Sequence, residues 1–304
     1  MENRVPAAFG LILFAMTIIG LIDNYVRLIA EDAGLFQFHF LRGVMAIPMI
    51  LAAAWWFGMT VRPKRIGAVA LRSLATTVSM FLYFGSLAIV PVANAGAGLF
   101  TSPIFVLLIS ALVLRQPVGL FRILAVGVGF AGVLLVLRPG GEGVSFTSAM
   151  PVLAGAFYAV GAVMTRRICA GESTMAILLG MFVTMTLAGG VGLAVLTWSG
   201  WGGGVEAGFF AMGWQPPTPR FWMLTLVQAV GSLIAVYCIT RAYLIAEAAF
   251  VGVFEYMFLL TAGFWGWLLW RQLPDLVTTI GIVLIVCAGA VIVLRSRPDR
   301  ARVR

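Results

Sequence analysis

The chain has 304 residues, of which 62% are hydrophobic and only 10% are charged. A soluble domain carries about 25% charged residues, and a globule of this size has too much surface to hide so many apolar side chains. The composition therefore excludes a soluble protein. It predicts an all-α integral membrane protein, in which the backbone polar groups are paired within helices.

The net charge of +9 would suggest a nucleic-acid partner if the protein were soluble. Here the Lys and Arg residues lie mainly in short loops and in the C-terminal tail, where such residues fix the orientation of membrane helices. We therefore expect no nucleic-acid partner, and we expect the lipid bilayer to be the main surroundings of the chain.

Ten apolar segments are long enough to be transmembrane helices, because about 20 residues are needed to cross the hydrocarbon core of a bilayer. In chain order they are 7–29, 37–57, 67–88, 91–113, 118–137, 149–168, 174–197, 221–243, 247–270 and 275–294. The first segment lacks the cleavage site of a signal peptide, so we expect it to be retained as a helix. The longest linker, from Trp198 to Arg220, is rich in Gly, Pro and Trp and is expected to lie against the membrane interface.

The distribution of basic residues predicts that both termini are cytoplasmic and that the protein lies in a bacterial inner membrane. With this orientation, most Lys and Arg residues, among them Arg62 and Lys64, face the cytoplasm. The outer segments then hold only Arg27, Arg138, Arg220 and Arg271. This asymmetry is the positive-inside signal of multi-pass membrane proteins.

The two halves of the chain resemble each other in sequence. Gly85–Gln116 aligns without a gap to Arg241–Gln272, at an offset of 156 residues, and both stretches have Arg-Gln shortly before a proline. Farther along, Phe130–Arg138 matches Cys287–Arg295. Two matches in nearly the same register are harder to attribute to chance than a single match of apolar residues.

We therefore predict two five-helix repeats, 1–140 and 149–295, followed by a basic cytoplasmic tail, 296–304. Because five is an odd number, the second repeat enters the membrane with the opposite orientation. Inverted repeats of this kind are typical of alternating-access transporters, whose substrate site lies near the midplane between the halves.

Related motifs close each half of the chain. They are Ser102-Pro103-Ile104-Phe105 with Leu114-Arg115-Gln116-Pro117, and Val253-Phe254-Glu255-Tyr256 with Trp267–Asp275. With Arg42 early in the second helix, these motifs resemble drug/metabolite transporters of the EamA type. The sequence departs from that family where Arg-Gln replaces the frequent Gly-Glu before the loop.

The resemblance to EamA-type transporters covers nearly the whole chain and implies both a fold and a class of activity. The implied fold is a bundle of ten helices. Members of this family export amino acids and toxic compounds, or import vitamins and cofactors such as riboflavin and S-adenosylmethionine. The resemblance therefore implies a secondary or facilitative transporter of a small organic metabolite.

Polar residues near the outer ends of the first two helices are candidates for a gate or an ion pair. They are Asp23, Asn24, Arg27, His39 and Arg42. Asp23 lies roughly 22 Å along the first helix, so it could share a depth with Arg42 and pair with it. It could instead pair with Arg27, four residues farther on. These charges either lock two helices together or form an outer gate or polar rim for a charged substrate.

Glu255 is the strongest candidate for a substrate contact, since ionisable residues in membrane segments are costly and often functional. It lies roughly 12 Å from the inner end of its helix. Its counterpart in the first repeat is Leu99, so the carboxylate breaks the internal symmetry. We expect Glu255, with the adjacent Tyr256, to bind a cationic substrate or to carry a coupling proton. The alternative is a neutral, hydrogen-bonded side chain between helices.

Weaker candidates are polar residues on helix faces that we expect to point inward. They are Asn94, Ser102, Thr76, Tyr83, Tyr158, Gln228 and Ser232. Thr76 and Ser232 are counterparts in the two repeats, which favours a common position between the halves. Each of these residues alone is equally consistent with a hydrogen bond between packed helices.

Other kinds of chemistry have little support in the sequence. Gly127–Gly132 fits GxGxxG, but no strand precedes it, so we expect no nucleotide site. Three scattered cysteines and one histidine do not support a disulfide framework or a metal site. We expect no cofactor and no catalytic residue. A membrane-embedded lipid-modifying enzyme and a lipid-flipping partner subunit are the alternatives. The substrate, direction, coupling ion and oligomeric state do not follow from the sequence.

Overall fold

The computed structural model describes residues 4–87, 92–115, 119–137 and 146–271, together with 276–277, 279–281, 283–284 and 287–288. Every regular element in these ranges is a helix, and no β-strand occurs among them. The helices are α1 (Val5–Asp23), α2 (Val26–Asp32), α3 (Leu35–Trp56), α4 (Ile66–Ser86), α5 (Val92–Leu99), α6 (Ser102–Leu108), the π-helix η1 (Ile109–Val113), α7 (Leu120–Leu137), α8 (Phe146–Arg167), α9 (Thr174–Trp198), the 3-10 helix η2 (Val205–Ala207), α10 (Gly208–Ala211), α11 (Pro219–Ile245), α12 (Ala248–Phe254) and α13 (Met257–Trp270).

Helical segments long and apolar enough to cross a bilayer make this a multi-pass membrane protein. The described residues contain seven of them: Val5–Asp32, Leu35–Trp56, Ile66–Ser86, Ala149–Arg167, Thr174–Trp198, Pro219–Ile245 and Phe250–Leu269. Each agrees with one predicted helix to within a few residues. The predicted helices 91–113 and 118–137 contain shorter apolar helices, Ser102–Val113 and Ile123–Gly132. The predicted helix 275–294 lies largely outside the described residues, so the ten-helix plan stays a prediction.

Three of the predicted helices are interrupted rather than continuous. Two residues that belong to neither helix separate α1 from α2, α5 from α6, and α12 from α13. Before α6 a cause is Pro103, which has no N–H to donate to the carbonyl of Leu99. At the third break the N–H of Phe258 donates to the carbonyl of Glu255 at 3.0 Å, the i+3 contact of a tightened helical turn.

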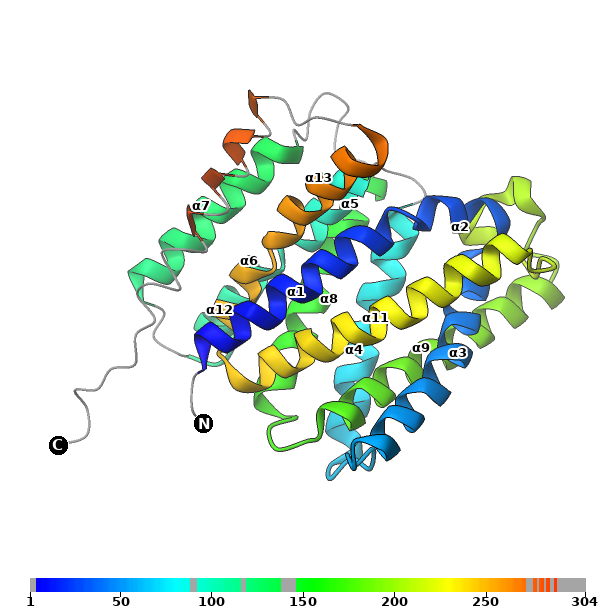
Figure 1. Cartoon of the computed structure of the whole chain (residues 1–304), viewed down its shortest axis with the longest axis horizontal. Helices are drawn as coiled ribbons and strands as arrows, with labels where there is room; N and C mark the ends of the chain where they lie inside the picture. Colours follow the sequence, from blue (N-terminus) through cyan, green and yellow to red (C-terminus); the bar gives the residue numbers. More distant parts are fainter. Residues whose placement is uncertain are drawn as a thin grey trace.

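The long helices pack closely through small residues. α1 lies along α11 and α13, α3 along α9, and α4 along α8; the first of these groups is seen at the front of Figure 1. A β-carbon added at Gly20 would come within 2.9 Å of the Ala262 backbone nitrogen, and one at Gly189 within 2.8 Å of the Phe40 backbone nitrogen. Glycine allows such close approach between membrane helices, and here it holds α1 against α13 and α9 against α3.

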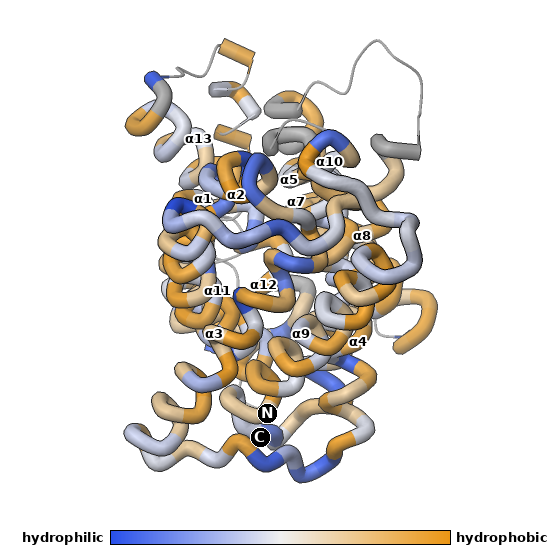
Figure 2. Tube along the Cα trace, turned by 90° about the vertical axis from the view of Figure 1, so that its right-hand side faces the viewer, coloured by the Kyte–Doolittle hydropathy of each residue, from blue (hydrophilic) through white to orange (hydrophobic). Residues whose placement is uncertain are grey.

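The bundle has two polar ends, which we call the N-face and the loop face. The N-face comprises Arg4 and the loops 57–65 and 168–173, and the N–H of Arg4 donates there to the carbonyl of Ile245 at 3.0 Å. The loop face comprises α2 and the segment 199–218. Figure 2 shows hydrophobic colour along most of the helices, with hydrophilic segments gathered mainly toward the two ends.

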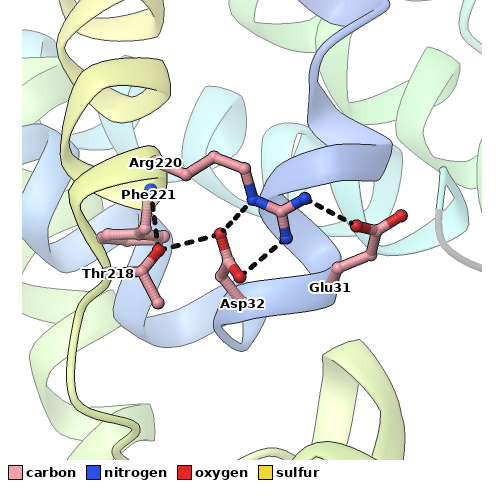
Figure 3. Close-up of polar contacts among 5 residues, drawn as sticks. All are labelled: Glu31, Asp32, Thr218, Arg220 and Phe221. Carbon is pink, nitrogen blue, oxygen red and sulfur yellow. Dashed lines mark hydrogen bonds and ion pairs between the residues drawn. The ribbon is translucent and has the colours of Figure 1, made fainter.

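At the loop face, Arg220 joins the start of α11 to α2. Its Nε and Nη2 donate to the two carboxylate oxygens of Asp32 at 2.9 and 2.7 Å, and its Nη1 donates to Glu31 at 3.0 Å (Figure 3). Thr218 donates to Asp32 at 3.1 Å and accepts the backbone N–H of Phe221 at 3.0 Å, so it also caps α11. We call the contacts of Asp32 with Thr218 and Arg220 the Asp32 latch.

At the N-face, Glu172 joins the loop 168–173 to the start of α4. Its two carboxylate oxygens accept the backbone N–H groups of Lys64 and Arg65, each at 2.8 Å. We call these contacts the Glu172 latch. Lys64 and Arg220 are 156 positions apart, which is the offset between the predicted repeats. Asp32 follows the first helix of the first half and holds the start of the third helix of the second half. Glu172 follows the first helix of the second half and holds the start of the third helix of the first half.

Candidate functional site

A buried cavity of about 90 Å³ lies in the middle of the bundle. Side chains from both predicted repeats line it, and its walls are mainly apolar. Its polar and ionisable residues are Asp23, Arg42, Arg72, Thr76, Tyr83, Ser102, Tyr158, Gln228, Ser232, Tyr243 and Glu255. An apolar cavity with a few convergent polar groups is the usual form of a small-molecule site.

Glu255 lies at the interruption between α12 and α13, and both of its oxygens accept hydrogen bonds. The hydroxyl of Tyr158 donates to Oε1 at 2.5 Å, and the hydroxyl of Tyr243 donates to Oε2 at 2.9 Å. The carboxyl group is 1% exposed. It comes seven residues after the start of α12, about 10 Å from the N-face at 1.5 Å per residue. Tyrosines from α8 and α11 thus converge on a buried acid from a third helix.

Asp23 forms a second buried group at the last residue of α1, toward the loop face. The hydroxyl of Tyr83 donates to its Oδ2 at 2.8 Å. Arg42 lines the same cavity and interacts electrostatically with Asp23, but no N–O distance between them is 4.0 Å or less. The predicted approach of Asp23 and Arg42 therefore takes the form of two charges facing one cavity, without a direct ion pair. Arg27 is exposed and makes no ion pair with Asp23.

The guanidinium of Arg42 is held mainly by aromatic rings. It lies 5.0 Å from the ring centroid of Phe38 and 4.9 Å from that of Phe84, distances at which a cation is attracted to the ring face. Its Nη2 also donates to Nδ1 of His39 at 3.1 Å. His39 therefore supports Arg42 and does not itself line the cavity.

Six of the weaker predicted residues line the cavity: Tyr83 and Tyr158, whose hydrogen bonds are given above, and four others. Gln228 donates to the carbonyl of Ile22 at 2.8 Å, which ties α11 to α1, and Ser232 donates within its own helix to Ala229 at 3.1 Å. Thr76 donates to the carbonyl of Arg72 at 2.7 Å. The Oγ of Ser102 is buried and has no hydrogen-bond partner among the described residues, so it is free to contact a solute.

Besides Arg27 and His39, two more predicted site residues, Tyr256 and Asn24, lie away from the cavity. The ring of Tyr256 faces α7, where a β-carbon added at Gly129 would be 2.4 Å from it; successive residues at a helical turn point in different directions, so Tyr256 does not follow Glu255 into the cavity. The side chain of Asn24 donates to the carbonyl of Gly20 at 2.6 Å, so it is engaged with a backbone carbonyl in the last turn of α1. The side chain of Asn94 lies outside the described residues.

Sequence reasoning missed three residues of this region, Arg72, Tyr243 and Thr165. Arg72 lies near the cytoplasmic end of the predicted helix 67–88, where the charge pattern also predicts basic residues, yet it is 4% exposed and lines the cavity. A signal was present, because Arg72 precedes Thr76 and Tyr83 by 4 and 11 residues and so shares one face of α4 with them. Among the described residues, no group of three or more His, Cys, Asp or Glu side chains could hold a metal ion.

The fold and this cavity define a multi-pass membrane protein with a small central cavity between packed helices. Residues 7–138 match the EamA-like transporter family. The chain is 30% identical over 249 residues to the pseudopaline exporter CntI of Pseudomonas aeruginosa, covering 81% of this chain and 80% of that protein. The chain therefore belongs to the EamA-like transporter family.

Two further comparisons support the same assignment. The chain is 27% identical over 273 residues to the riboflavin transporter of Rhizobium johnstonii, covering 85% of each protein. A solved crystal structure superposes with a TM-score of 0.73 at 18% identity, covering 94% of this chain and 96% of that chain. At this identity the structural match establishes the shared fold alone. The relatives establish that transport of small metabolites is the activity of the group.

Proposed function

We propose that this protein moves a small organic metabolite across the bacterial inner membrane by alternating access, with the cavity as its solute site. The observation that carries the proposal is Glu255, a buried carboxylate at a helix break that faces the cavity and is positioned by Tyr158 and Tyr243. Interrupted helices near the membrane midplane are where secondary transporters bind solutes and coupling ions. The named activities of the two relatives, pseudopaline export and riboflavin transport, support a small organic metabolite as the cargo.

Glu255 has two possible roles in transport, which predict different defects. If it binds a cationic group of the cargo, Glu255→Gln removes the charge while it keeps the shape and one hydrogen-bonding oxygen. Both uptake and exchange of the cargo should then fall. If it carries a coupling proton, the same change should abolish the response to a pH gradient while solute exchange continues.

Reconstituted proteoliposomes test the proposal directly. The full-length protein would be assayed with a panel of radiolabelled amino acids, riboflavin and S-adenosylmethionine, with and without a pH gradient. Glu206→Gln is the matched control, because Glu206 is exposed in the segment between α9 and α11. We expect Glu255→Gln to lower transport at least about ten-fold, the effect of losing a charge-assisted hydrogen bond, and Glu206→Gln to have no effect. Equal rates and pH responses in the wild type and Glu255→Gln would contradict the proposed site.

A further inference from the structure

Arg72 is a buried cation that lines the cavity. It lies on α4, about 9 Å from the helix start at 1.5 Å per residue, and it is 4% exposed. Its Nε donates to the hydroxyl of Thr165 at 3.0 Å, and that hydroxyl donates in turn to the carbonyl of Gly161 at 2.8 Å. Its Nη1 is buried and has no hydrogen-bond partner. Thr165 therefore fixes the direction of the guanidinium, while Nη1 is left without a hydrogen bond from the described residues.

No acidic side chain among the described residues forms an ion pair with Arg72. The two acids of the cavity are already engaged, Glu255 by two tyrosine hydroxyls and Asp23 by a third. The electrostatic neighbours of Arg72 are Cys169, Tyr158 and Tyr243, which are neutral in their ordinary protonation states at neutral pH. Arg72 thus lacks a compensating negative charge from the described part of the chain.

Arg42, the other arginine of the cavity, has compensation that Arg72 lacks. Aromatic rings of Phe38 and Phe84 lie against its guanidinium, and Asp23 interacts with it electrostatically. A buried charge without such partners is strongly unfavourable, and within a membrane segment it commonly marks a substrate pathway. The contrast between these two arginines identifies Arg72 as the group that requires an anion.

We propose that Arg72 binds a carboxylate group of the transported solute, so that the cargo is a small carboxylate-bearing metabolite. This inference rests on the proposed function of the cavity and specifies its substrate class. A guanidinium binds a carboxylate through charge-assisted N–H donors, and with Nε held by Thr165 the unpaired Nη1 is available for such a bond. Thr165 is a positioning residue that holds the guanidinium toward the cavity.

Matched acid and amide pairs test the charge requirement. The full-length protein in detergent would be titrated with 4-methylpentanoate and 4-methylpentanamide, nicotinate and nicotinamide, and L-leucine and L-leucinamide. The melting temperature would be followed by tryptophan fluorescence. We expect at least one acid to raise the melting temperature more than its amide does. Equal shifts within every pair, or no shift by any acid, would overturn the proposal.

Variants then assign the effect to Arg72. In Arg72→Gln the acid-dependent shift should disappear, with binding weakened at least about ten-fold, whereas Arg72→Lys should keep part of it. Arg62→Gln removes the same charge from an exposed loop at the N-face and should behave as the wild type. An acid-dependent shift that survives in Arg72→Gln would also overturn the proposal.

A purely structural role for Arg72 predicts a different result in the absence of solute. Because Arg72 has no ionic partner to lose, unliganded Arg72→Gln should melt at the same temperature as the wild type or higher. A clear fall in that temperature would assign the residue to folding and contradict our inference. Glu255→Gln could abolish transport while each acid and its amide shift the melting temperature equally. In that case the proposed transport site stands and only the assignment of a carboxylate to Arg72 fails.

Discussion

The rings of Phe100 and Tyr256 pack edge to face, with centroids 6.4 Å apart, although 156 positions separate them in the chain. Each residue lies at a helix interruption, Phe100 before α6 and Tyr256 before α13. Their separation equals the offset between the two predicted repeats. The contact therefore joins corresponding points of the two halves, as expected near a pseudo-two-fold axis.

We predict that the repeats 1–140 and 149–295 superpose after a half-turn about an axis in the membrane plane. Arg115 and Arg271 support this, because both have left-handed backbone conformations, with φ of 48° and 56°, and they are 156 positions apart. An experimental structure in lipid would test the prediction. It is contradicted if α4–α6 and α11–α13 pack differently within their halves.

Much of the helix plan could be predicted from the sequence, because the length and hydropathy of a membrane span are local properties. The predicted segment 174–197 and the observed α9, Thr174–Trp198, are an example. The interruptions could not be predicted in this way. The break at Glu255 lies in an apolar segment with no proline at that point, and the contacts of its side chain come from Tyr158 and Tyr243, which are distant in the sequence or on another helix.

The candidate site was predicted in part for a similar reason. Glu255 was identifiable because an acid among apolar residues is conspicuous. Arg72 lies near a helix end, where a basic residue is also expected from the positive-inside rule. Its burial and its place in the cavity wall, which only the structure shows, distinguish it from a loop residue. Which way Tyr256 points depends on its packing against Gly129, and a single sequence does not specify that contact.

The two tyrosines that hold Glu255 should each be needed for efficient transport. Tyr158→Phe and Tyr243→Phe each remove one hydrogen bond to the carboxyl group, and bonds to charged groups contribute about 1.5–3 kcal/mol. We expect solute affinity in proteoliposomes to fall about ten-fold for each variant. Tyr237→Phe is the control, since Tyr237 lies on the same helix as Tyr243 but lines a separate apolar recess. Equal transport by Tyr237→Phe and Tyr243→Phe would contradict the assignment.

Gly98 should be intolerant of any side chain. A β-carbon there would lie 2.5 Å from the carbonyl carbon of Pro151 and 2.7 Å from the backbone nitrogen of Val152, so α5 and α8 would have to separate. We expect Gly98→Ala to destabilise the protein by about 1–3 kcal/mol, as overpacked cores do. The melting temperature in detergent measures this. Gly127→Ala is the control, because nothing lies within 4 Å of a β-carbon at Gly127. Similar melting of both variants would refute the close crossing.

The positive-inside pattern predicts that the N-face is cytoplasmic. In a cysteine-free background, Gly204→Cys should react with an impermeant maleimide added outside spheroplasts, whereas Arg62→Cys should react only after lysis. Gly204 lies at the loop face with no atom within 4 Å of an added β-carbon, so the substitution is sterically tolerated. The opposite labelling pattern would reverse the orientation.

The two latches should control access from opposite sides of the membrane. Arg220→Gln weakens the Asp32 latch and should favour opening at the loop face, whereas Glu172→Gln weakens the Glu172 latch and should favour opening at the N-face. Ser232→Cys supplies a thiol in the cavity that reports access. We expect Arg220→Gln to increase its labelling from the loop face, because the substitution removes the ion pairs that hold the start of α11 to α2. Unchanged labelling from both sides in both variants would rule out the latches as gates.

The small size of the cavity has a consequence for selectivity. A volume of about 90 Å³ is smaller than the roughly 300–1,000 Å³ of typical sites for organic ligands. A cargo must therefore push the helices apart as it binds, and part of its attraction to Arg72 and Glu255 is spent on that expansion. Between two solutes with the same charged groups, the bulkier one should bind less tightly unless its extra apolar surface offsets the work of widening the bundle.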